Sequence, residues 1–391
     1  MVQSLIYVRK VVMRAFGFYK ICLVMTAFTL LNFFSEGPVA SQNLKYTVTD
    51  LGTFGGGRSV AFSINNSGQV VGNAETSLNE AHAFLYEAGT LIDLGTLGGK
   101  ESYAYHISDS CFIVGRSQNR RGFYRAFITT CATDSPMFDL SSLDPSLDGS
   151  YSTVSGVNKT GQAVGYTATE AAANHEGGVR SRPFLFSNNR ITDLGTLGGE
   201  ESIATAINDA EQIVGYISKS PHGAYAEHRG YRYYRGTMSD LGTLGGRTTT
   251  PTDINGSGNV VGYAQTIGGE PHAFIYSANT LQDLGTLPGG TQSLAFGINN
   301  RGEVVGAADT STGSLHAFLY STGTMQDLND LIPPLSGWIL AEARSINESG
   351  HIVGNGIIKG QQHGFLLTPV VDQAARKGRP HMNLAMKRAE R

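Results

Sequence analysis

Four histidines stand at one position of a repeated pattern, and their number and spacing raise the possibility of metal binding or general-base chemistry. They are His82, His272, His316 and His363, and each is followed two residues later by phenylalanine. Three other copies of the pattern carry arginine at this position, namely Arg125, Arg182 and Arg229. Because arginine is not deprotonated in proteins, it serves neither as a metal ligand nor as a base. Histidine and arginine share only the ability to donate hydrogen bonds, so a carboxylate is the expected partner.

The pattern supplies such a carboxylate in every copy. The seven aspartates are Asp50, Asp93, Asp139, Asp193, Asp240, Asp283 and Asp327. A serine or threonine follows the aspartate in six copies, at Ser59, Ser102, Ser152, Ser202, Thr249 and Ser293. We therefore predict a structural polar network at these positions. We predict no catalytic residue, no metal site and no cofactor.

Five of the seven aspartates begin a heptapeptide that recurs along the chain. DLGTLGG occupies 93–99, 193–199 and 240–246, and near copies occupy 50–56 and 283–289. A catalytic loop is needed once, whereas a structural device is needed once per structural unit. Units of 40–50 residues that contain several short strands are typical of propeller blades.

Each unit has room for four short strands. In the first unit we expect strands at 60–65, 69–74, 82–86 and 90–94, with a tight turn at 65–68. The VVG segment of every unit ends in glycine, which indicates close backbone approach or a bulge in the second strand. The heptapeptide then forms the crossing from the outer strand of one blade to the inner strand of the next, where its glycines permit positive dihedral angles.

The two ends of the repeat array complete each other. Residues 46–52 supply an outer strand without its preceding strands, and residues 363–369 supply a third strand without an outer one. Joining them would close the ring and remove exposed sheet edges. We predict an all-β propeller of seven four-stranded blades closed by the N-terminal strand, with six blades, eight blades or an open array as alternatives.

The repeated HAF at 82–84, 272–274 and 316–318, together with the VVG and DLGTLGG segments, resembles the HAF family of extracellular repeat proteins. The last unit, residues 327–354 followed by HGFLLTPV, is similar to how such proteins end. The resemblance covers residues 46–370 and implies an extracellular or cell-envelope location. It implies no activity, because the repeat alone defines the family. The predicted network of His, Ser/Thr and Asp also resembles the one that ties blades together in WD-repeat propellers.

Composition supports an all-β chain and argues against one class of partner. The 391 residues include 50 glycines, nearly twice the average share of about 7%. Ten of the 29 basic residues and three of the 32 acidic residues lie in the two end segments, 1–41 and 371–391. The body, 42–370, is left with 19 basic and 29 acidic residues, a formal charge of −10. An acidic body argues against nucleic-acid binding, which needs a positive field.

The end segments differ from the body. Residues 21–34 are uncharged and apolar, follow a basic stretch, and precede small residues that suit signal peptidase. We predict that 1–41 is a signal peptide or a retained N-terminal anchor, and that membrane contact depends on its retention. The protein is then secreted, periplasmic or attached to the cell envelope. Residues 371–391 form a basic tail that we expect to be disordered, and the body 42–370 is expected to be a monomer.

The body contains two cysteines. Cys111 stands where five other units have the turn glycine, and Cys131 lies just past the third strand of the same unit. Because the second and third strands of a blade run antiparallel, the start of one lies beside the end of the other. In an exported protein this placement predicts a disulfide.

Two inner-strand residues also break the repeat. His106 and Asp253 precede the Ile that ends the inner strand, where other units have Ser, Gly or Ala. They could reach a central channel, although packing residues are the more common explanation of such single substitutions.

Function is expected where the sequence does not repeat. The loops between VVG and HAF in units two to four carry a basic and aromatic set, which predicts a recognition surface. The candidate ligand-binding residues are Arg120, Arg121, Tyr124, His175, Arg180, His222, Tyr225, His228, Tyr231 and Arg232. The predicted function is a binding or scaffold protein without catalysis that recognises a glycan, an envelope polymer or a protein. The alternative is a carbohydrate-active hydrolase or lyase with its site at the propeller mouth.

Overall fold

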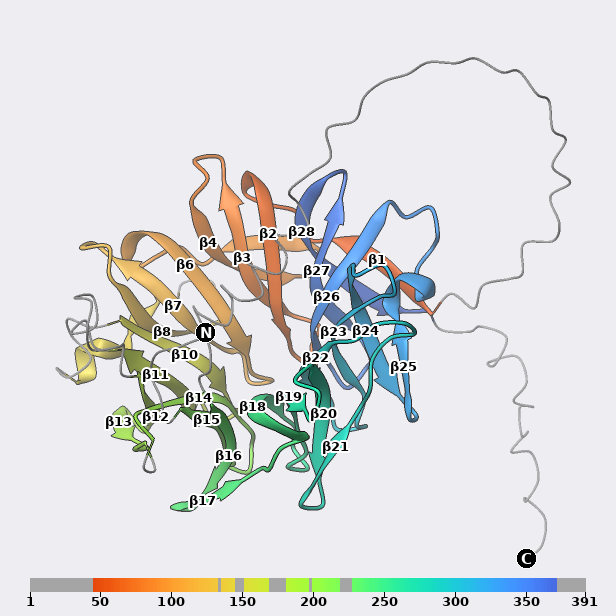
Figure 1. Ribbon diagram of the computed structural model, residues 1–391. Coiled ribbons are helices and arrows are strands. Elements are labelled where there is room, and N and C mark those ends of the chain that lie inside the picture. The colour runs from red at the N-terminus through yellow and green to blue at the C-terminus, as the bar shows by residue number, and fades with distance from the viewer. Residues whose placement is uncertain are drawn as a thin grey trace, which may run out of the picture. The chain divides into compact units, whose positions relative to one another are not determined.

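The computed structural model contains seven antiparallel four-stranded sheets arranged as blades around a ring (Figure 1). It describes residues 45–132, 135–144, 151–168, 181–196, 199–218 and 227–370, which all belong to one compact unit. The chain is therefore a seven-bladed β-propeller, as the sequence predicts. The predicted N-terminal segment 1–41 and the basic tail 371–391 lie outside the described residues.

Every blade is built from consecutive strands, except that the last blade recruits β1. The inner strands are β2 Gly55–Ile64, β6 Gly98–Ile107, β10 Tyr151–Val157, β14 Glu201–Ile207, β18 Gly245–Ile254, β22 Ser293–Ile298 and β26 Trp338–Ile346. The second strands are β3 Val70–Thr76, β7 Phe112–Asn119, β11 Ala163–Ala168, β15 Ile213–Ser218, β19 Val260–Thr266, β23 Val304–Asp309 and β27 Ile352–Ile358. The third strands are β4 Ala81–Glu87, β8 Tyr124–Thr130, β12 Ser181–Ser187, β16 His228–Tyr234, β20 Pro271–Ser277, β24 Leu315–Ser321 and β28 Gln361–Pro369. The outer strands are β5 Thr90–Asp93, β9 Phe138–Asp139, β13 Arg190–Asp193, β17 Thr237–Asp240, β21 Thr280–Asp283, β25 Thr324–Asp327 and β1 Tyr46–Asp50.

We number the blades 1 to 7 from the one that begins with β2. Two short 3-10 helices, η1 Leu140–Leu143 and η4 Leu328–Leu331, follow the outer strands of blades 2 and 6. The crossings between blades and the loops between second and third strands lie at one end of the strands, which we call the crossing face. The inner-strand turns and the hairpins between third and outer strands lie at the other end, which we call the turn face.

The N-terminal strand closes the ring. β1 pairs with β28 in an antiparallel register from Tyr46↔Pro369 to Asp50↔Phe365. The two strands lie side by side although they come from opposite ends of the described chain (Figure 1). Tyr46 is buried in a cluster with Leu340 and Phe365 of the same blade. The closure predicted from the two incomplete ends is therefore confirmed.

The VVG glycine is required by close approach of neighbouring strands. A Cβ atom on Gly72 would lie 1.9 Å from the carbonyl oxygen of Val60 and 2.8 Å from the ring of Phe84. The inner strand shifts register opposite this glycine, between Ala61 and Ser63. The repeated glycine thus accommodates both a bulge and the aromatic ring that fills the space between blades.

The crossing begins the inner strand earlier than the sequence pattern predicts. β2 starts at Gly55 rather than at residue 60, and Gly55 has a φ of +97°. Gly52, in the same crossing, has a φ of +77°. A side chain on Gly56 would lie 2.5 Å from the Cβ atom of Glu75. Glycine is therefore needed here for backbone conformation and for space.

The turn face carries a belt of hydrogen bonds from blade to blade. The Asn that opens the inner-strand turn donates from its Nδ2 to the backbone carbonyl at the same position of the next blade. Among the described residues this link is made by Asn65, Asn158, Asn208, Asn255, Asn299 and Asn347. Blade 2 has Ser108 at this position, so the belt changes at its joint with blade 3. There the ring of Phe112 packs against Gly161 instead.

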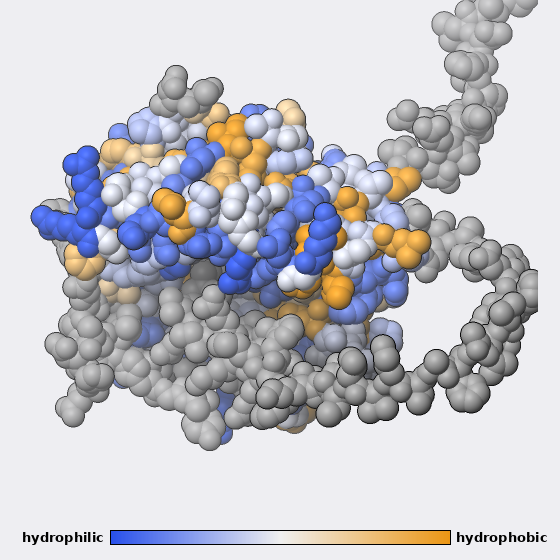
Figure 2. All heavy atoms as spheres, turned by 90° about the horizontal axis from the view of Figure 1, so that it is seen from above, coloured by the Kyte–Doolittle hydropathy of each residue, from blue (hydrophilic) through white to orange (hydrophobic). Residues whose placement is uncertain are grey.

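The surface is mixed in polarity. On the side seen in Figure 2, hydrophobic residues occur in small groups among hydrophilic ones. Within the part of the chain that the structure describes, no helix has the length and apolar character needed to cross a membrane.

Candidate functional site

The repeated histidines and arginines pair with the repeated aspartates inside single blades. The bonds join the third strand to the outer strand of the same blade, as between His82 Nδ1 and an Asp93 carboxylate oxygen at 2.8 Å. The same pairing joins His272 to Asp283, His316 to Asp327, His363 to Asp50, Arg182 to Asp193 and Arg229 to Asp240. The aspartate also accepts a hydrogen bond from the backbone N–H two residues later, as Asp93 does from Gly95 N at 2.7 Å. These side chains therefore stabilise the hairpin and the start of the crossing.

Blade 2 modifies this arrangement. Arg125 is only 2% exposed, and Asp139 accepts from Ser141 N to cap η1. In blade 2 a helical turn follows the outer strand, and the aspartate still accepts a hydrogen bond from the backbone N–H two residues later.

The repeated serines bond to backbone atoms rather than to the His–Asp pairs. Ser102 Oγ accepts from Ala83 N of the preceding blade at 2.8 Å and donates to Gly95 O at 2.6 Å. Ser59, Ser152 and Ser293 likewise accept from the backbone of the neighbouring blade. The serine thus bonds to backbone atoms between blades, while the His–Asp pair lies within a blade. The serine and the His–Asp pair therefore have separate hydrogen-bond partners in the described blades.

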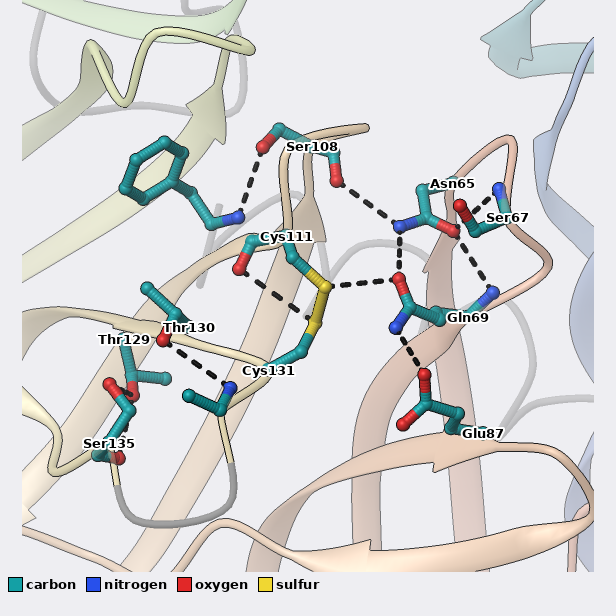
Figure 3. Close-up of a disulfide and its surroundings, with 12 residues drawn as sticks. Asn65, Ser67, Gln69, Glu87, Ser108, Cys111, Thr129, Thr130, Cys131 and Ser135 are labelled. Atoms are coloured by element: carbon teal, nitrogen blue, oxygen red, sulfur yellow. Dashed lines mark hydrogen bonds between the residues drawn. A yellow bond between two sulfur atoms is a disulfide. The ribbon is translucent and has the colours of Figure 1, made fainter.

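Cys111 and Cys131 form a disulfide that joins the turn residue before β7 to the residue after β8. Their Cα atoms are 5.5 Å apart, and the bridge lies beside the turn of blade 1, where Gln69 contacts Cys111 Sγ (Figure 3). Cys111 has a φ of +66°, the left-handed conformation that glycine adopts in five of the other turns. The bridge therefore holds the blade whose turn departs most from the repeat.

The predicted ligand-binding loops are only partly described. His175, Arg180, His222 and Tyr225 lie outside the described residues. Arg120 and Arg121 are exposed in the tight turn between β7 and β8, and Tyr124 begins β8 beside them. The crossing face of blade 2 thus presents two arginines next to a tyrosine.

The candidate ligand-binding residues of blade 4 that the structure describes lie in three different places. His228 begins β16 at the crossing face and stacks on Tyr216, with ring centroids 4.5 Å apart. Tyr231 is 2% exposed and donates from its hydroxyl to Ile203 O, so its role is packing. Arg232 pairs with Val214 and lies toward the turn face. The prediction of one contiguous surface that includes Tyr231 and Arg232 is therefore wrong, because strand register places them in the core and at the opposite end.

Four tyrosines surround one arginine where blade 2 meets blade 3. The Arg116 guanidinium carbon lies 4.5 to 5.7 Å from the ring centroids of Tyr103, Tyr105, Tyr124 and Tyr151. Arg116 also donates to the Tyr151 hydroxyl. These residues come from β6, β7, β8 and β10, which are neighbours in Figure 1. We call these five residues the tyrosine cluster.

An acidic residue fixes two of the rings. Tyr103 donates to the Glu101 carboxylate at 3.2 Å, and Tyr124 donates to the same oxygen. Burial, together with this carboxylate, raises the pKa of both phenols, so they stay protonated donors. Burial alone would lower the pKa of Arg116, but the surrounding tyrosines raise it, so the cation persists. The cluster is thus a fixed array of aromatic rings around a permanent positive charge.

Sequence reasoning missed most of this cluster, although a signal was present. Arg116 follows the VVG glycine, and the equivalent residues are Asn73, Tyr166, Tyr216, Tyr263, Ala307 and Asn355. An arginine therefore occurs there once. Searching for single departures within the strands, and not only within loops, would have found Arg116.

Asp253, one of the two inner-strand exceptions, bonds to the next blade as the serines at its position do. Ser63 and Ser345 accept from the backbone N–H at the next blade's inner-strand Ile, and Asp253 does the same from Ile298 N at 3.0 Å. Burial lowers the pKa of His106 and raises that of Asp253, each opposed by the charge of the other. Asp253 therefore has a structural role, and His106 is its electrostatic neighbour.

The crossing face of blade 4 contains two further perturbed groups. Burial raises the pKa of the Glu201 carboxyl to about 7 and lowers the pKa of His228 to about 4. Within the described part of the chain, no group of three or more His, Cys, Asp and Glu side chains is placed to hold a metal ion.

Known proteins share the fold of this chain, and one family shares part of its sequence. The family described as "Protein of unknown function (DUF3466)" matches residues 242–379. No curated protein matches the sequence.

The similar solved structures include propellers and peptidases. A puromycin-hydrolyzing peptidase of Mycobacterium tuberculosis has 11% identity and a TM-score of 0.55, over 81% of this chain and 51% of the peptidase. A puromycin hydrolase complexed with PGG has 9% identity and a TM-score of 0.50, over 78% of this chain and 51% of that one. The β-propeller domain of the Trilobed protease from Pyrococcus furiosus has 9% identity and a TM-score of 0.49, over 84% and 98%. This chain spans about half of each hydrolase, and the likeness shows the propeller fold alone.

Proposed function

We propose that this chain is an exported binding protein without catalysis that holds an acidic glycan at the tyrosine cluster and the neighbouring arginines. The observation that carries the proposal is the enclosure of Arg116 by four tyrosine rings. These residues depart from the repeat, and the blades fold without them elsewhere in the ring. A set of side chains that the framework does not require is available for recognition.

The tyrosines supply flat faces with polar edges. Tyr103, Tyr124 and Tyr151 are partly exposed, and their rings are held by Arg116 and Glu101. Tyrosine gives a large contact area at a low cost in conformational entropy, and rings that are already fixed lose less entropy on binding. Arg116 therefore acts as a positioning residue for the aromatic surface.

Charge for an acidic ligand comes from the adjacent turn. Arg120 and Arg121 are exposed, and neither has an acidic partner among the described residues. A guanidinium binds carboxylate and sulfate groups through paired hydrogen bonds. Two such groups beside exposed aromatic edges suit a sugar that carries an acid group.

The disulfide supports export. Disulfides persist in oxidising compartments and are rare in the cytosol. Together with the apolar segment 21–34, the Cys111–Cys131 bridge favours a secreted, periplasmic or envelope location. Mass measurement of protein recovered from the periplasm would show loss of residues 1–40 or 1–41 if the segment is a cleaved signal. An intact N-terminus in a membrane fraction would instead indicate an anchor.

The proposal is tested by probing the purified protein on an array of acidic and neutral glycans. We expect binding to acidic glycans that weakens with salt, because the arginines provide the attraction. Binding to neutral glycans alone, or to none, would contradict the proposal and leave an envelope polymer or a protein as the partner.

Each glycan that binds is then incubated with the protein, and its products are separated by chromatography. We expect no turnover. Turnover would favour the alternative, a carbohydrate-active hydrolase or lyase, for which the Glu201 carboxyl with its pKa of about 7 offers a candidate acid.

A further inference from the structure

A hollow of about 250 Å³ lies on the turn face of blade 4, at the opposite end of the strands from the tyrosine cluster. Its described lining residues are Gln212, Arg232, Tyr234, Arg235, Thr237 and Ser239. Two of these residues are cationic and none is acidic. The body, residues 42–370, has a formal charge of −10, so two guanidinium groups without an acidic residue in the same hollow make this region locally positive.

Arg232 departs from the repeat at a position that is otherwise apolar. The other six blades carry Leu85, Ile128, Leu185, Ile275, Leu319 and Leu366 at this point, each opposite the same valine of the second strand. In blade 4 the arginine takes the position instead, and its guanidinium lies 5.8 Å from the ring centroid of Tyr276 in blade 5. The described residues provide no carboxylate partner for it.

Gln212 has also lost the acceptor that its equivalents use. In blade 1, Gln69 Nε2 donates to Glu87 at 2.6 Å, and in blade 3, Gln162 Nε2 donates to Ser187 at 3.4 Å. Blade 4 has Tyr234 at the position of Glu87 and Ser187. Gln212 Oε1 still accepts from Asn208 at 2.8 Å, but its Nε2 has no acceptor among the described residues.

The hairpin completes a lining of hydrogen-bond donors. Arg235 occupies the left-handed position of the hairpin, with a φ of +50°, where blades 1 and 5 have Ala88 and Ala278. Thr237 and Ser239 add two hydroxyl groups from β17. Two guanidinium groups, one amide and two hydroxyls thus surround one hollow, and an oxyanion would satisfy them and remove the repulsion between the arginines.

We propose that this hollow is an anion-binding site that takes a carboxylate, sulfate or phosphate group of a small acidic ligand. The site is separate from the tyrosine cluster in blade and in face. Arg232 and Arg235 contact the charged oxygens, and Gln212 orients the group from the side of the inner-strand turn.

The test is calorimetric titration of the full-length protein with sodium sulfate, sodium phosphate and sodium glucuronate at constant ionic strength. We expect saturable binding of at least one of these anions with a dissociation constant near 1 mM, which is about the affinity of a few charge-assisted hydrogen bonds. The anion that binds best separates a carboxylate source from a sulfate or phosphate source. Absence of saturable binding for all three would overturn the proposal.

Variants that restore the repeat locate the binding. Arg232→Leu installs the residue type of the other blades, so the fold should persist, and it should weaken binding by at least about tenfold. Arg235→Ala, at an exposed position, should weaken the same binding by a smaller factor. The matched control is Arg190→Thr, which removes an outer-hairpin arginine of blade 3 and should leave the affinity within about twofold. Equal losses in the control, or none in Arg232→Leu, would contradict the assignment.

Discussion

Blades 5 and 6 follow the repeat, whereas blades 2 and 4 keep the same backbone but change the side chains that project from it. In blade 5, His272 bonds to Asp283, and Ile275 fills the space that Arg232 takes in blade 4. In blade 2, Arg116 stands where blade 6 has Ala307. All four blades keep the VVG glycine and the four-stranded order.

The difference shows which side chains the fold uses. In the regular blades, polar side chains at repeat positions are engaged in hairpin and inter-blade bonds. In blades 2 and 4, the additional arginines and tyrosines make contacts with one another or line a hollow, while the four-stranded order of the blade is kept. Stability should therefore depend on the repeated residues, and binding should depend on the departures.

The largest expected effect comes from removing ring closure. Deletion of residues 42–52 removes β1, exposes the edge of β28 and takes away Asp50, the partner of His363. We expect loss of cooperative unfolding in urea, because an open blade exposes strand edges and core residues of blade 7. An unchanged transition midpoint would show that the blades are stable as an open array.

The next effect compares a regular core position with its counterpart in blade 4. Phe274→Ala should lower the free energy of unfolding by about 3 to 5 kcal/mol, because this fully buried ring fills the space between blades. Tyr231→Phe restores the repeat residue in blade 4 and removes one hydroxyl bond to Ile203 O, so it should cost about 1 kcal/mol. Denaturant titration measures both. A loss from Tyr231→Phe as large as that from Phe274→Ala would show that blade 4 is not built on the same core.

Removal of the disulfide should have a somewhat smaller effect. Replacing both Cys111 and Cys131 with Ser opens a loop of twenty residues and should lower the free energy of unfolding by about 3 kcal/mol. A second variant, Cys111→Gly with Cys131→Ser, should recover part of this loss because glycine adopts the positive φ without strain.

Mass spectrometry of non-reduced peptides should show the bridge in wild-type protein, and two alkylatable thiols in that sample would refute it.

The smallest effect is a pH dependence that separates histidine blades from arginine blades. The hydrogen bond to Asp327 raises the pKa of His316 above its ordinary value of 6.5. Burial works to raise the pKa of Asp327, but the bonds from His316 and Asn329 hold it below the ordinary 3.8. The histidine contribution is complete below pH 6.5 and is lost as pH rises through the folded pKa. The aspartate contribution is complete above pH 3.8 and is lost as pH falls through its folded pKa.

The pair therefore stabilises the protein fully between about pH 3.8 and 6.5. His316→Arg copies the pairs of blades 3 and 4 and stays charged at higher pH. Between pH 6.5 and 8.5, wild-type protein should lose about 1 kcal/mol relative to this variant in denaturant titrations. Parallel stability curves for the two proteins would show that the pair contributes nothing.

The sequence alone predicts the fold because most structural requirements recur in five to seven of the repeat units. Gly72 and its equivalents mark the close approach of strands, and the incomplete ends at Tyr46 and Phe365 indicate closure. The start of β2 at Gly55 is not predicted, because pairing in the crossing depends on backbone contacts that leave no hydrophobic pattern. The link from Ser102 to the preceding blade is missed for a related reason, since its partners are backbone atoms.

The site is less predictable than the fold. Arg120, Arg121 and Tyr124 follow from the unusual loop sequence, but the approach of Tyr151 to Arg116 depends on how blade 3 packs against blade 2. Tyr231 and Arg232 are adjacent in sequence, yet one is buried and the other lies in the hollow, because successive side chains of a strand point to opposite faces.

The central claim is that departures from the repeat bind ligand while the repeated residues only build the ring. The direct measurement compares two variants with wild-type protein in titrations with the best acidic glycan from the array. The first is Arg120→Ser with Arg121→Ser, which removes two exposed charges beside the tyrosine cluster. The matched control is Arg58→Ser with Arg247→Ser, which removes two exposed charges at the start of the inner strands of blades 1 and 5.

All three proteins should unfold at similar denaturant concentrations, because exposed substitutions change stability by about 0.5 kcal/mol or less. The account predicts that the first variant binds at least about tenfold more weakly and with less dependence on salt, while the control stays within about twofold of wild-type protein. Equal affinities for the first variant and wild-type protein, or an equal loss in the control, would contradict it.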